Sequence, residues 1–400
     1  MYLTKDEEKI INGEEGWAKA KALQVIVSVG DSLEAEKLID ISHAHISGVS
    51  YSNIGDPGRK LIKMFADSGV RFSVPSTVNP IGYDMEDYKA IPYTKIDLNY
   101  INNQNEILKS LHKMGADLTL SCTPYDLPNI KNLKIGNSVA WGESNAVVYA
   151  NSILGLRTNR EGGPISLMAA ITGKIYYYGL HINENRIPEI KYVIEKPYNY
   201  NIDEVRAGVF GEILSKIHDS DKPPFINETL DKLAMKEFFA SLGASGNIAM
   251  VYIDKITPEK LGKKILKEVK IDYKEIEKRK EELSPNKKPE VIYLGCPHSS
   301  AEDLYKLANI LKKTNKKYDV KIVVTLSRSE IQKIESNALK ILKDHNVNLI
   351  ADTCLIVSPF GYKGLSVATN SYKAYFYLSK KGIDVSLISI NDIPKVIDND

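Results

Sequence analysis

The sequence contains very little cysteine: three residues among 400, at Cys122, Cys296 and Cys354. An odd, small number of widely separated cysteines excludes the disulfide framework that is typical of small secreted domains. Long apolar runs are also missing, since no segment approaches the roughly 20 apolar residues that span a bilayer. The N-terminal residues MYLTKDEEKIING include no apolar core of signal-peptide length. These absences predict a cytoplasmic protein.

An excess of charge of one sign is missing as well. The 53 basic and 51 acidic side chains give a net charge of +2, and the lysines are interleaved with glutamates. This balance argues against nucleic acid or a membrane as the main partner, because both are anionic and attract a strongly basic surface. The content of 43% hydrophobic and 26% charged residues is typical of an ordinary globular protein. A chain of this length can form two or three domains.

The first part of the chain has an α/β pattern. Thr4 and Glu7 form a capping-box pattern at the start of a long predicted helix. Short apolar runs at 71–75 and 116–121 then alternate with a helical stretch at 103–115. This alternation of strands and helices predicts an α/β fold.

The middle of the chain has mixed signals and ends in a charged segment. A helix pattern rich in small residues occupies 143–155, and a strand is expected at 246–254. The dense charge at 258–285 predicts an exposed helix or connector and a domain boundary. We therefore expect an N-terminal α/β region at residues 1–285, with room for two subdomains, and a C-terminal domain at 286–400.

The C-terminal part has the most regular pattern. Strands are predicted at 290–295, 321–327, 347–352 and 384–390, and helices at 299–313, 329–343 and 371–382. Four strands that alternate with three helices indicate a mostly parallel, doubly wound sheet with right-handed crossovers. Ligands of such domains gather at the carboxyl ends of the strands.

Each of the three cysteines lies at, or just after, the end of a predicted strand. Because strand ends in α/β proteins face the ligand crevice, thiols that are distant in sequence can converge there. Pro124 and Pro297 follow two of them and end the strands. Buried thiols that act as small hydrophobic groups remain an alternative.

Three thiolates, if they form a site, suit soft metals: zinc or an iron–sulfur cluster. They leave one coordination position for substrate or water, which Lewis-acid catalysis requires. A neighbouring histidine, His298, could complete a structural zinc site with the three cysteines. The long separations between the cysteines argue against it, because structural zinc sites usually take paired ligands from short local loops.

Polar residues in turns and at a helix start are further candidates. In AHISGVSY at 44–51, the glycine permits close backbone approach and a serine hydroxyl can donate to an anion. Asn79 and Pro80 form a turn that can present an amide. Glu143 and Ser144 follow a glycine and begin a helix, where the carboxylate can cap the helix or the free amides can bind an anion. On the residues alone, an ordinary loop, turn or cap explains each of them.

The last predicted helix begins with four polar residues: Thr369, Asn370, Ser371 and Lys373. Their amides and hydroxyls, with one positive charge, form a place where a phosphate or carboxylate can dock. We therefore interpret Lys373 as a ligand for an anionic end of a substrate. Arg157, Arg160 and the glycines of EGGP at 161–164 are second choices, because surface arginines near glycine-rich turns are common.

At these residues the sequence resembles the aconitase X family, in segments that follow the same order over essentially the whole chain. The matching segments are MYLTKDEEKIINGEEG at the start, AHISGVSY at 44–51, VPSTVNPIGYD at 74–84, SCTPY at 121–125, WGESNAVVYANSILGLRTNREGGP at 141–164, GCPHSS at 295–300, DTC at 352–354 and TNSYK at 369–373. The resemblance implies an aconitase-like architecture. It also implies an iron–sulfur cluster, of the 4Fe–4S type with one open iron, held by Cys122, Cys296 and Cys354.

The resemblance also implies the substrate contacts and a partner. The expected substrate-binding residues are Gly48, Val49, Ser50, Asn79, Pro80, Glu143, Ser144 and Lys373. The family's complete enzyme includes a small swivelling domain, which is a separate subunit in some members, so we expect this chain to be the large subunit of a heterodimer. By resemblance to aconitases the general base is expected on the small subunit, and no base is assigned here.

The activity implied by the resemblance is that of a hydro-lyase. Chains of this length with a separate small subunit resemble members that dehydrate (R)-mevalonate 5-phosphate to trans-anhydromevalonate 5-phosphate in isoprenoid biosynthesis, with iron as the Lewis acid. Two alternatives remain open. One is a hydroxyproline dehydratase of the same family, and the other is a non-catalytic zinc-binding or partner-binding protein.

Overall fold

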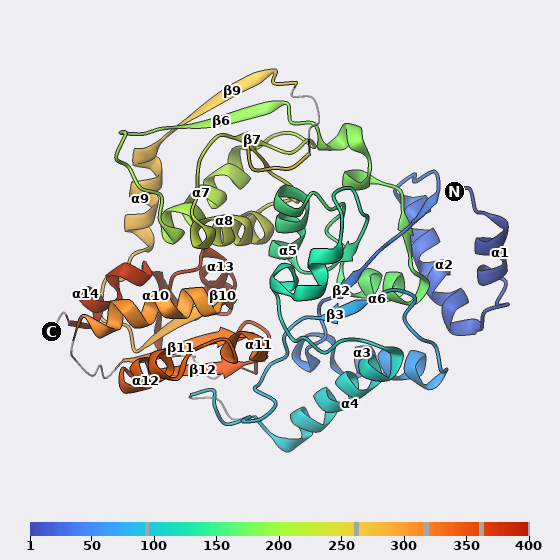
Figure 1. The fold of residues 1–400 in the computed structure, drawn as a ribbon, viewed down its shortest axis with the longest axis horizontal. Helices are drawn as coiled ribbons and strands as arrows, with labels where there is room; N and C mark the ends of the chain where they lie inside the picture. The colour runs from blue at the N-terminus through green and yellow to red at the C-terminus, as the bar shows by residue number, and fades with distance from the viewer. Residues whose placement is uncertain (93–95, 260–263, 315–319, 360–363, 399–400) are drawn as a thin grey trace.

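Helices and parallel strands alternate along the chain (Figure 1). The computed structural model describes all residues except 93–95, 260–263, 315–319, 360–363 and 399–400. Within this part of the chain there are three parallel sheets, of three, four and five strands, and one antiparallel pair. The predicted α/β class with mostly parallel sheets is therefore confirmed. None of the described helices is long and apolar enough to cross a membrane.

The N-terminal part is built around a short parallel sheet in the order β3-β2-β4. Its strands are β2 (Ala44–Ile46), β3 (Ser76–Val78) and β4 (Ala140–Trp141). The helices are α1 (Lys5–Ile11), α2 (Trp17–Ser32), α3 (Tyr51–Asp67), α4 (Leu98–Met114), α5 (Ser144–Tyr149), which continues as a π-helical turn (Ala150–Leu154), and α6 (Gly163–Thr172). The antiparallel pair is β1 (Leu38–Asp40) with β5 (Lys174–Tyr176). Short 3-10 turns lie at Pro124–Asp126, Pro128–Asn132, Gly179–His181 and Asn183–Arg186.

The middle part contains a four-stranded parallel sheet in the order β8-β7-β6-β9. Its strands are β6 (Ile190–Glu195), β7 (Phe225–Ile226), β8 (Tyr252–Ile253) and β9 (Lys267–Asp272). Its helices are α7 (Glu204–Ile217), α8 (Lys232–Ser245) and α9 (Tyr273–Leu283). The rings of Phe210 and Phe238 stack with their centroids 5.0 Å apart and join α7 to α8. These two helices lie between the sheet and the rest of the molecule (Figure 1).

The C-terminal part is a five-stranded parallel sheet in the order β12-β11-β10-β13-β14. Its strands are β10 (Val291–Ser299), β11 (Lys321–Leu326), β12 (Val347–Ala351), β13 (Ser366–Thr369) and β14 (Asp384–Leu387). Its helices are α10 (Ala301–Lys312), α11 (Arg328–Ile331), α12 (Ser336–Asp344), α13 (Tyr372–Lys380) and α14 (Ile393–Asp398), with a 3-10 turn at Ile390–Asp392. The first strand lies in the middle, so the chain winds outward in both directions. The predicted doubly wound arrangement is confirmed, and its topological switch point lies between β10 and β13.

Two predicted strands near the N-terminal sheet are wrong. Residues 71–75 form no strand, because Phe72 and Ser73 donate their N–H groups to Met114 and Ala170 at the ends of other helices. Residues 116–121 form only a single bridge, between Asp117 and Thr77. Leu120 interrupts any longer pairing, because its φ of 44° leaves the extended region.

The predicted N-terminal helix forms as two helices, α1 and α2. The capping box of Thr4 and Glu7 is present, with both of its hydrogen bonds. The chain turns between the helices at Gly13 and Gly16, whose φ values are positive.

Three further predictions need correction. The charged segment at 258–285 is partly a strand, because Val269 and Ile271 alternate with charged residues and pair as β9 along the sheet edge. The strand expected at 246–254 is limited to β8, since Asn151 and the hydroxyl of Ser152 bind the backbone of Ala249 and Val251. The C-terminal sheet has a fifth strand, β13, that the sequence pattern did not reveal, and the helix predicted at 329–343 is divided into α11 and α12.

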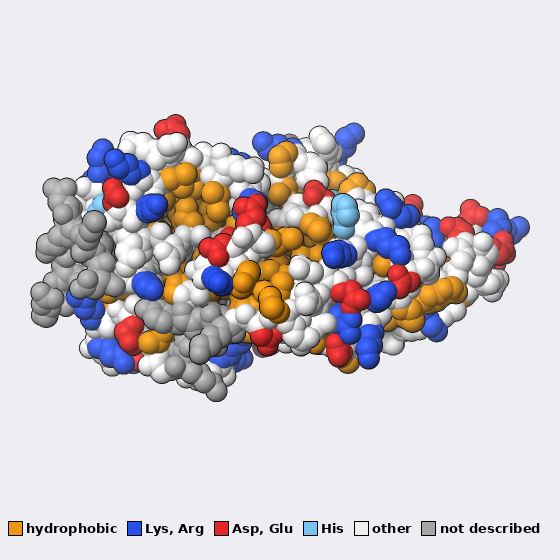
Figure 2. Space-filling view, turned by 90° about the horizontal axis from the view of Figure 1, so that it is seen from below, with side chains coloured by type: hydrophobic (Ala, Val, Ile, Leu, Met, Phe, Trp, Pro, Cys, Tyr) orange, Lys and Arg blue, Asp and Glu red, His pale blue; other side chains and the backbone are white. Residues whose placement is uncertain are grey.

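Several apolar side chains are exposed on α3, at the start of α4 and between these two helices. Leu61 and Met64 on α3, Met85, Tyr88, and Leu98 at the start of α4 are all exposed. Helices α3 and α4 lie at the lower edge of Figure 1. Seen from below, apolar side chains gather near the middle of the face shown, among charged groups (Figure 2).

Candidate active site

The carboxyl ends of the N-terminal and C-terminal sheets meet at one cavity of about 320 Å³. Residues that follow β2, β3 and β4 line it from one side. Residues of β10 at the point where its pairing is interrupted, and residues after β12 and β13, line it from the other. The two sheets are joined directly beside it, where Cys354 N–H donates to the Ile81 oxygen (2.8 Å) and Ile81 N–H to the Asp352 oxygen (3.0 Å).

The cavity brings together every residue that the sequence singled out as a cluster ligand or substrate contact. It is lined by Gly48, Val49, Ser50, Asn79, Pro80, Cys122, Glu143, Ser144, Cys296, Cys354 and Lys373, and also by Ser47, Asn53, Gly142, Gly295, Ile356, Val357 and Tyr377. Residues far apart in the chain thus share one site. Their position at strand ends follows the general rule for ligand sites of α/β sheets.

The three cysteines reach the cavity in different ways. Cys122 follows an irregular segment rather than a strand, Cys296 lies within β10, and Cys354 follows β12 by three residues. Cys122 and Cys296 are buried and Cys354 is half-buried. Burial raises the pKa of each of the three thiols above its ordinary value.

Gly295 places Cys296 beside the cavity. Its φ is 100°, and a Cβ at this position would lie 2.2 Å from the Thr325 carbonyl oxygen. Only glycine tolerates both conditions. The pairing of β10 with β11 shifts in register between Leu294 and Ser299, so the ladder is interrupted where the cysteine occurs.

His298 supports the cysteine loops. Its backbone N–H donates to the Cys122 Sγ (3.2 Å), and its Nε2 donates to the Thr353 carbonyl oxygen (2.8 Å). Burial lowers the pKa of His298 to about 4, so its imidazole is neutral at pH 7. Among the described residues, no three His, Cys, Asp or Glu side chains are close enough together to hold a single metal ion.

A chain of buried hydrogen bonds leads to three residues of the cavity lining, Asn79, Glu143 and Lys373. Thr77 Oγ1 pairs with His45 Nδ1 (2.8 Å), and His45 Nε2 donates to Asn79 Oδ1 (2.7 Å). Asn79 Nδ2 then donates to Glu143 Oε2 (2.6 Å), and Lys373 Nζ donates to Glu143 Oε1. Burial lowers the pKa of His45 to about 4, which keeps this ring neutral.

Glu143 and Lys373 form a buried ion pair within this chain. Burial alone would raise the pKa of Glu143, but the Lys373 ammonium and the Asn79 amide lower it below its ordinary value. Lys373 also donates to Ser144 Oγ (3.0 Å) and Asn145 Oδ1 (3.1 Å). The interpretation of Glu143 as a simple helix cap is wrong, because its side chain makes no cap hydrogen bond to α5. All three ammonium protons of Lys373 have acceptors.

The loop after β2, at residues 47–50, lines another side of the cavity. Ser50 Oγ donates to the Val357 carbonyl oxygen (2.9 Å) and so ties this loop to the segment that follows Cys354.

Asn145 and Tyr377 were missed by the sequence analysis. Asn145 Nδ2 donates to the Cys122 carbonyl oxygen (3.1 Å). Helical spacing could have revealed Tyr377, since it lies four residues after Lys373 on the same face of α13.

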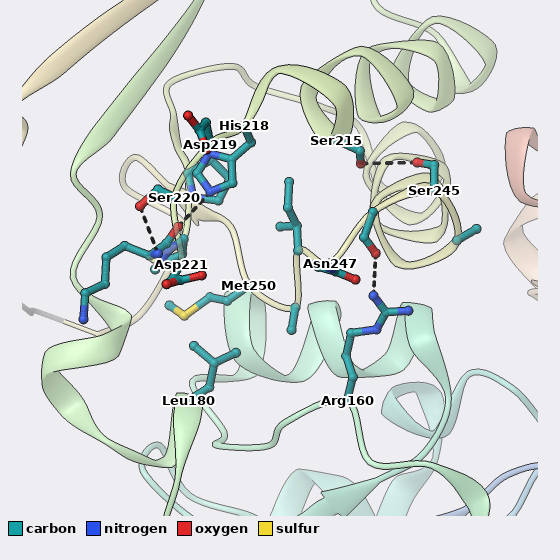
Figure 3. Close-up of a pocket in the computed structure, with 17 residues that line it drawn as sticks. Arg160, Leu180, Ser215, His218, Asp219, Ser220, Asp221, Ser245, Asn247 and Met250 are labelled. Atoms are coloured by element: carbon teal, nitrogen blue, oxygen red, sulfur yellow. Dashed lines mark hydrogen bonds between the residues drawn. The ribbon is translucent and has the colours of Figure 1, made fainter. Parts of the chain in front are cut away.

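The second-choice residues lie outside this cavity. Arg157 donates to the His181 carbonyl oxygen (3.1 Å) and lines neither this cavity nor the larger one that Arg160 lines. Arg160 lines a second, larger cavity (Figure 3). In EGGP, Gly163 lets the chain approach the loop after β2, because a Cβ there would lie 2.4 Å from the Ser47 carbonyl oxygen.

The other polar residues around the start of α13 have supporting roles. Thr369 is the last residue of β13, and Asn370 is buried with no hydrogen-bond partner for its Oδ1. Ser371 caps α13 and donates its hydroxyl to the Cys296 carbonyl oxygen.

A cavity lined by three thiols and a buried ion pair, at the carboxyl ends of two parallel sheets, is typical of an enzyme with a soft-metal cofactor. Family comparisons agree with this class. Models of the aconitase X first, second and third domains match residues 1–184, 187–281 and 289–397. A phosphomevalonate dehydratase large subunit from Aeropyrum pernix is 49% identical over 99% of this chain and 100% of the relative. The chain belongs to the aconitase X family.

A solved structure has the same fold. The crystal structure of Thermococcus kodakaraensis aconitase X in its holo form matches with a TM-score of 0.88 and 35% identity, over 99% of each chain. The aconitase-like architecture is therefore confirmed. Cis-3-hydroxy-L-proline dehydratase from Pseudomonas aeruginosa is more distant, at 26% identity over 93% of this chain and 65% of that relative.

Proposed function

We propose that this chain is the large subunit of an iron–sulfur hydro-lyase that dehydrates (R)-mevalonate 5-phosphate to trans-anhydromevalonate 5-phosphate in isoprenoid biosynthesis. Its family and its relatives make it an enzyme of the dehydratase class. The observation that carries the proposal is the single cavity, which is lined by all three cysteines and by every predicted substrate contact.

The donor set fits an iron–sulfur cluster. Three thiols from distant segments line one cavity, and the His298 N–H donates to one of the sulfurs. Hydrogen bonds to cysteine sulfurs are a usual means of tuning such clusters. A 4Fe–4S cluster distributes its thiolates over several irons, so its ligands do not have to converge on one ion as zinc ligands do. Cys122, Cys296 and Cys354 would hold the cluster and leave one iron open.

When bound, such a cluster would supply a Lewis acid for the departing hydroxyl. The chain's own residues would orient the substrate beside it. The loop at Gly48, Val49 and Ser50 offers backbone amides, and Asn79 and Ser144 offer polar side chains elsewhere in the cavity lining. The Glu143–Lys373 pair would hold these groups in place and keep a carboxylate ionised within a buried site.

The large-subunit name of the relatives implies a small partner. We propose a heterodimer in which the small subunit covers the cavity and supplies the general base. The active site would then lie between the two chains.

An anaerobic assay tests this function. The chain with its reconstituted cluster is mixed with its small partner and offered mevalonate 5-phosphate or cis-3-hydroxy-L-proline, and loss of water is followed by mass spectrometry. We expect dehydration of the phosphorylated substrate. Turnover of hydroxyproline alone would favour the alternative dehydratase, and a colourless, iron-free protein that dehydrates neither compound would favour a non-catalytic role.

A further inference from the structure

The three proposed cluster ligands are held by different elements. The His298 N–H donates to the Cys122 sulfur (3.2 Å), and the Ser371 hydroxyl donates to the Cys296 carbonyl oxygen. Cys354 is the half-buried member of the three. Its own N–H donates across to a carbonyl oxygen of the N-terminal part of the chain. The position of Cys354 therefore depends on how the C-terminal part is joined to the N-terminal part.

A network of ion pairs holds the residue two positions before Cys354. Arg328, the first residue of α11, donates its backbone N–H to Asp352 Oδ1 (3.1 Å) and its Nε to Asp352 Oδ2 (3.0 Å). Its Nη2 donates to Asp84 Oδ1 (2.6 Å), and its Nη1 pairs with Glu86 Oε2 (2.7 Å). Asp84 and Glu86 follow β3 in the N-terminal part. One guanidinium thus joins the segment before Cys354 to the other side of the site.

Asp84 extends this network to the backbone of the same segment. Its second oxygen accepts the N–H of Ala351, the last residue of β12 (2.8 Å). The carboxylates of Asp84 and Asp352 are both buried. Buried carboxylates need a cation that compensates their charge, and Arg328 serves both of them.

Asp352 has a backbone conformation that requires such support. Its φ is 58°, in the left-handed region that side chains other than glycine rarely adopt. Residues of this kind persist where the surrounding structure holds them, and they occur often at functional sites. The chain leaves β12 at Asp352, and Cys354 lines the cavity two residues later.

We propose that Arg328 is a positioning residue, which holds Cys354 in place for the cluster through Asp352 and Asp84. The inference rests on the proposed function, because it assigns a role toward the proposed cluster. Without the guanidinium, Asp84 and Asp352 are two buried carboxylates that lack their shared cation. The segment of Cys354 then separates from the N-terminal part, whereas the contacts that hold the other two cysteines remain.

The first test measures how firmly the reconstituted chain holds its cluster. A chelator is added to the anaerobic protein, and the loss of visible absorption is followed. Arg328→Gln should lose its cluster about tenfold faster than the wild type or more, as expected for a residue that orients a ligand. Arg328→Lys should restore part of the loss, since it keeps the charge but not the planar fork. Asp84→Asn, far from every cysteine in the sequence, should act in the same direction as Arg328→Gln.

Arg206→Gln is the matched control. Arg206 also binds two carboxylates, those of Asp203 and Glu277, but it lies on α7 in the middle part of the chain. Its side chain is 22% exposed, against 29% for Arg328. This variant should lose its cluster at the wild-type rate.

The second test uses the three thiols of the iron-free chain as internal controls. The rate at which iodoacetamide alkylates each cysteine is read by peptide mass spectrometry. In Arg328→Gln, we expect Cys354 to react about fivefold faster or more, because its segment opens locally, with Cys122 and Cys296 nearly unchanged. A general loss of stability would instead expose all three thiols together.

The outcomes distinguish this inference from the proposed function. Equal acceleration at all three cysteines, or none at Cys354, would overturn the positioning role. Faster alkylation of Cys354 with unchanged loss of the cluster would overturn its relevance to the cluster. If the wild-type chain binds no cluster at all, the proposed function fails, and the alkylation pattern alone decides whether Arg328 positions Cys354.

Discussion

At the scale of single residues, the Glu143–Lys373 pair is the central polar feature of the site. Both side chains of the pair are largely buried: 12% of the Glu143 side chain and 10% of the Lys373 side chain are exposed. Two desolvated charges stabilise the fold only while they remain together, because either one alone is left uncompensated.

We predict that removing one partner of this pair costs more stability than removing both. Lys373→Met should lower the free energy of unfolding by roughly 3 kcal/mol or more, because the Glu143 carboxylate is left buried without its cation. The double variant Glu143→Gln, Lys373→Met should recover part of that loss. Urea unfolding of the single and double variants measures it. Strictly additive losses would show that the two charges do not interact.

A second buried carboxyl, Glu237 on α8, should make stability depend on pH. Burial raises the pKa of Glu237 to about 8, although Lys236 partly opposes this. The folded protein then keeps a proton that the unfolded chain releases above its ordinary pKa. Stability from this group is therefore present at about pH 5 and is lost as the pH rises through about 8, by roughly 1.4 kcal/mol per pH unit at most.

Glu237→Gln should remove that dependence. We expect the variant to gain stability over the wild type as the pH increases from about 5 to 8. Thermal unfolding of both proteins across this range measures the difference. A constant difference between them at every pH would mean that Glu237 is already ionised in the folded state.

The sequence predicted the site residues better than their interactions. Expected strand ends pointed to the three cysteines, since strand ends meet at sheet edges, whereas most of the other lining residues were identified through the resemblance of their motifs to one family. The Glu143–Lys373 contact joins a residue that follows β4 to a residue of α13, which follows β13 in another sheet, and no local pattern encodes that packing. The same limit applies to Asn145, whose amide donates to the Cys122 carbonyl oxygen, 23 residues earlier in the chain.

At the scale of elements, β10 connects the sheet to the site. Its glycine, Gly295, combines positive φ with close contact to Thr325. The cysteine that follows is a proposed cluster ligand, so the geometry of this strand end should affect cluster binding.

We predict that Gly295→Ala destabilises the protein by at least about 2 kcal/mol and lowers its iron content. The control is Gly382→Ala in the same domain, where φ is also positive, at 74°, but no atom lies within 4 Å of the new Cβ. That variant should cost only about 1 kcal/mol, from backbone strain. Similar losses of stability and iron in both variants would exclude a special role for the Thr325 contact.

Elements with long periodic patterns were the most predictable. Most of the strands and helices after residue 290 were anticipated, because long apolar runs alternate there with amphipathic helices. The strands of the N-terminal sheet have two or three residues each and provide too little pattern to detect. The strand β13 was missed for the same reason, since only four residues, Ser366–Thr369, fill the gap between β10 and β14.

At the scale of the whole molecule, two parallel sheets face one another across the site. The large-subunit name of the relatives places such a chain in an assembly with a small partner. We predict that the isolated chain folds and binds its cluster but does not dehydrate mevalonate 5-phosphate. Activity should appear on addition of the small partner, with a sigmoid or saturating dependence on its concentration. Full turnover by the purified chain alone would contradict a base on the partner.

The proposed activity requires that Cys122, Cys296 and Cys354 hold one cluster, although they come from three distant segments. The direct measurement is the iron and sulfide content of the anaerobically purified chain and of its three single Cys→Ser variants, together with their visible absorption. We predict that each substitution removes most of the iron, the sulfide and the colour, while the far-ultraviolet circular dichroism of the folded chain remains. Full iron and sulfide in any one variant, Cys354→Ser above all, would contradict the three-ligand site.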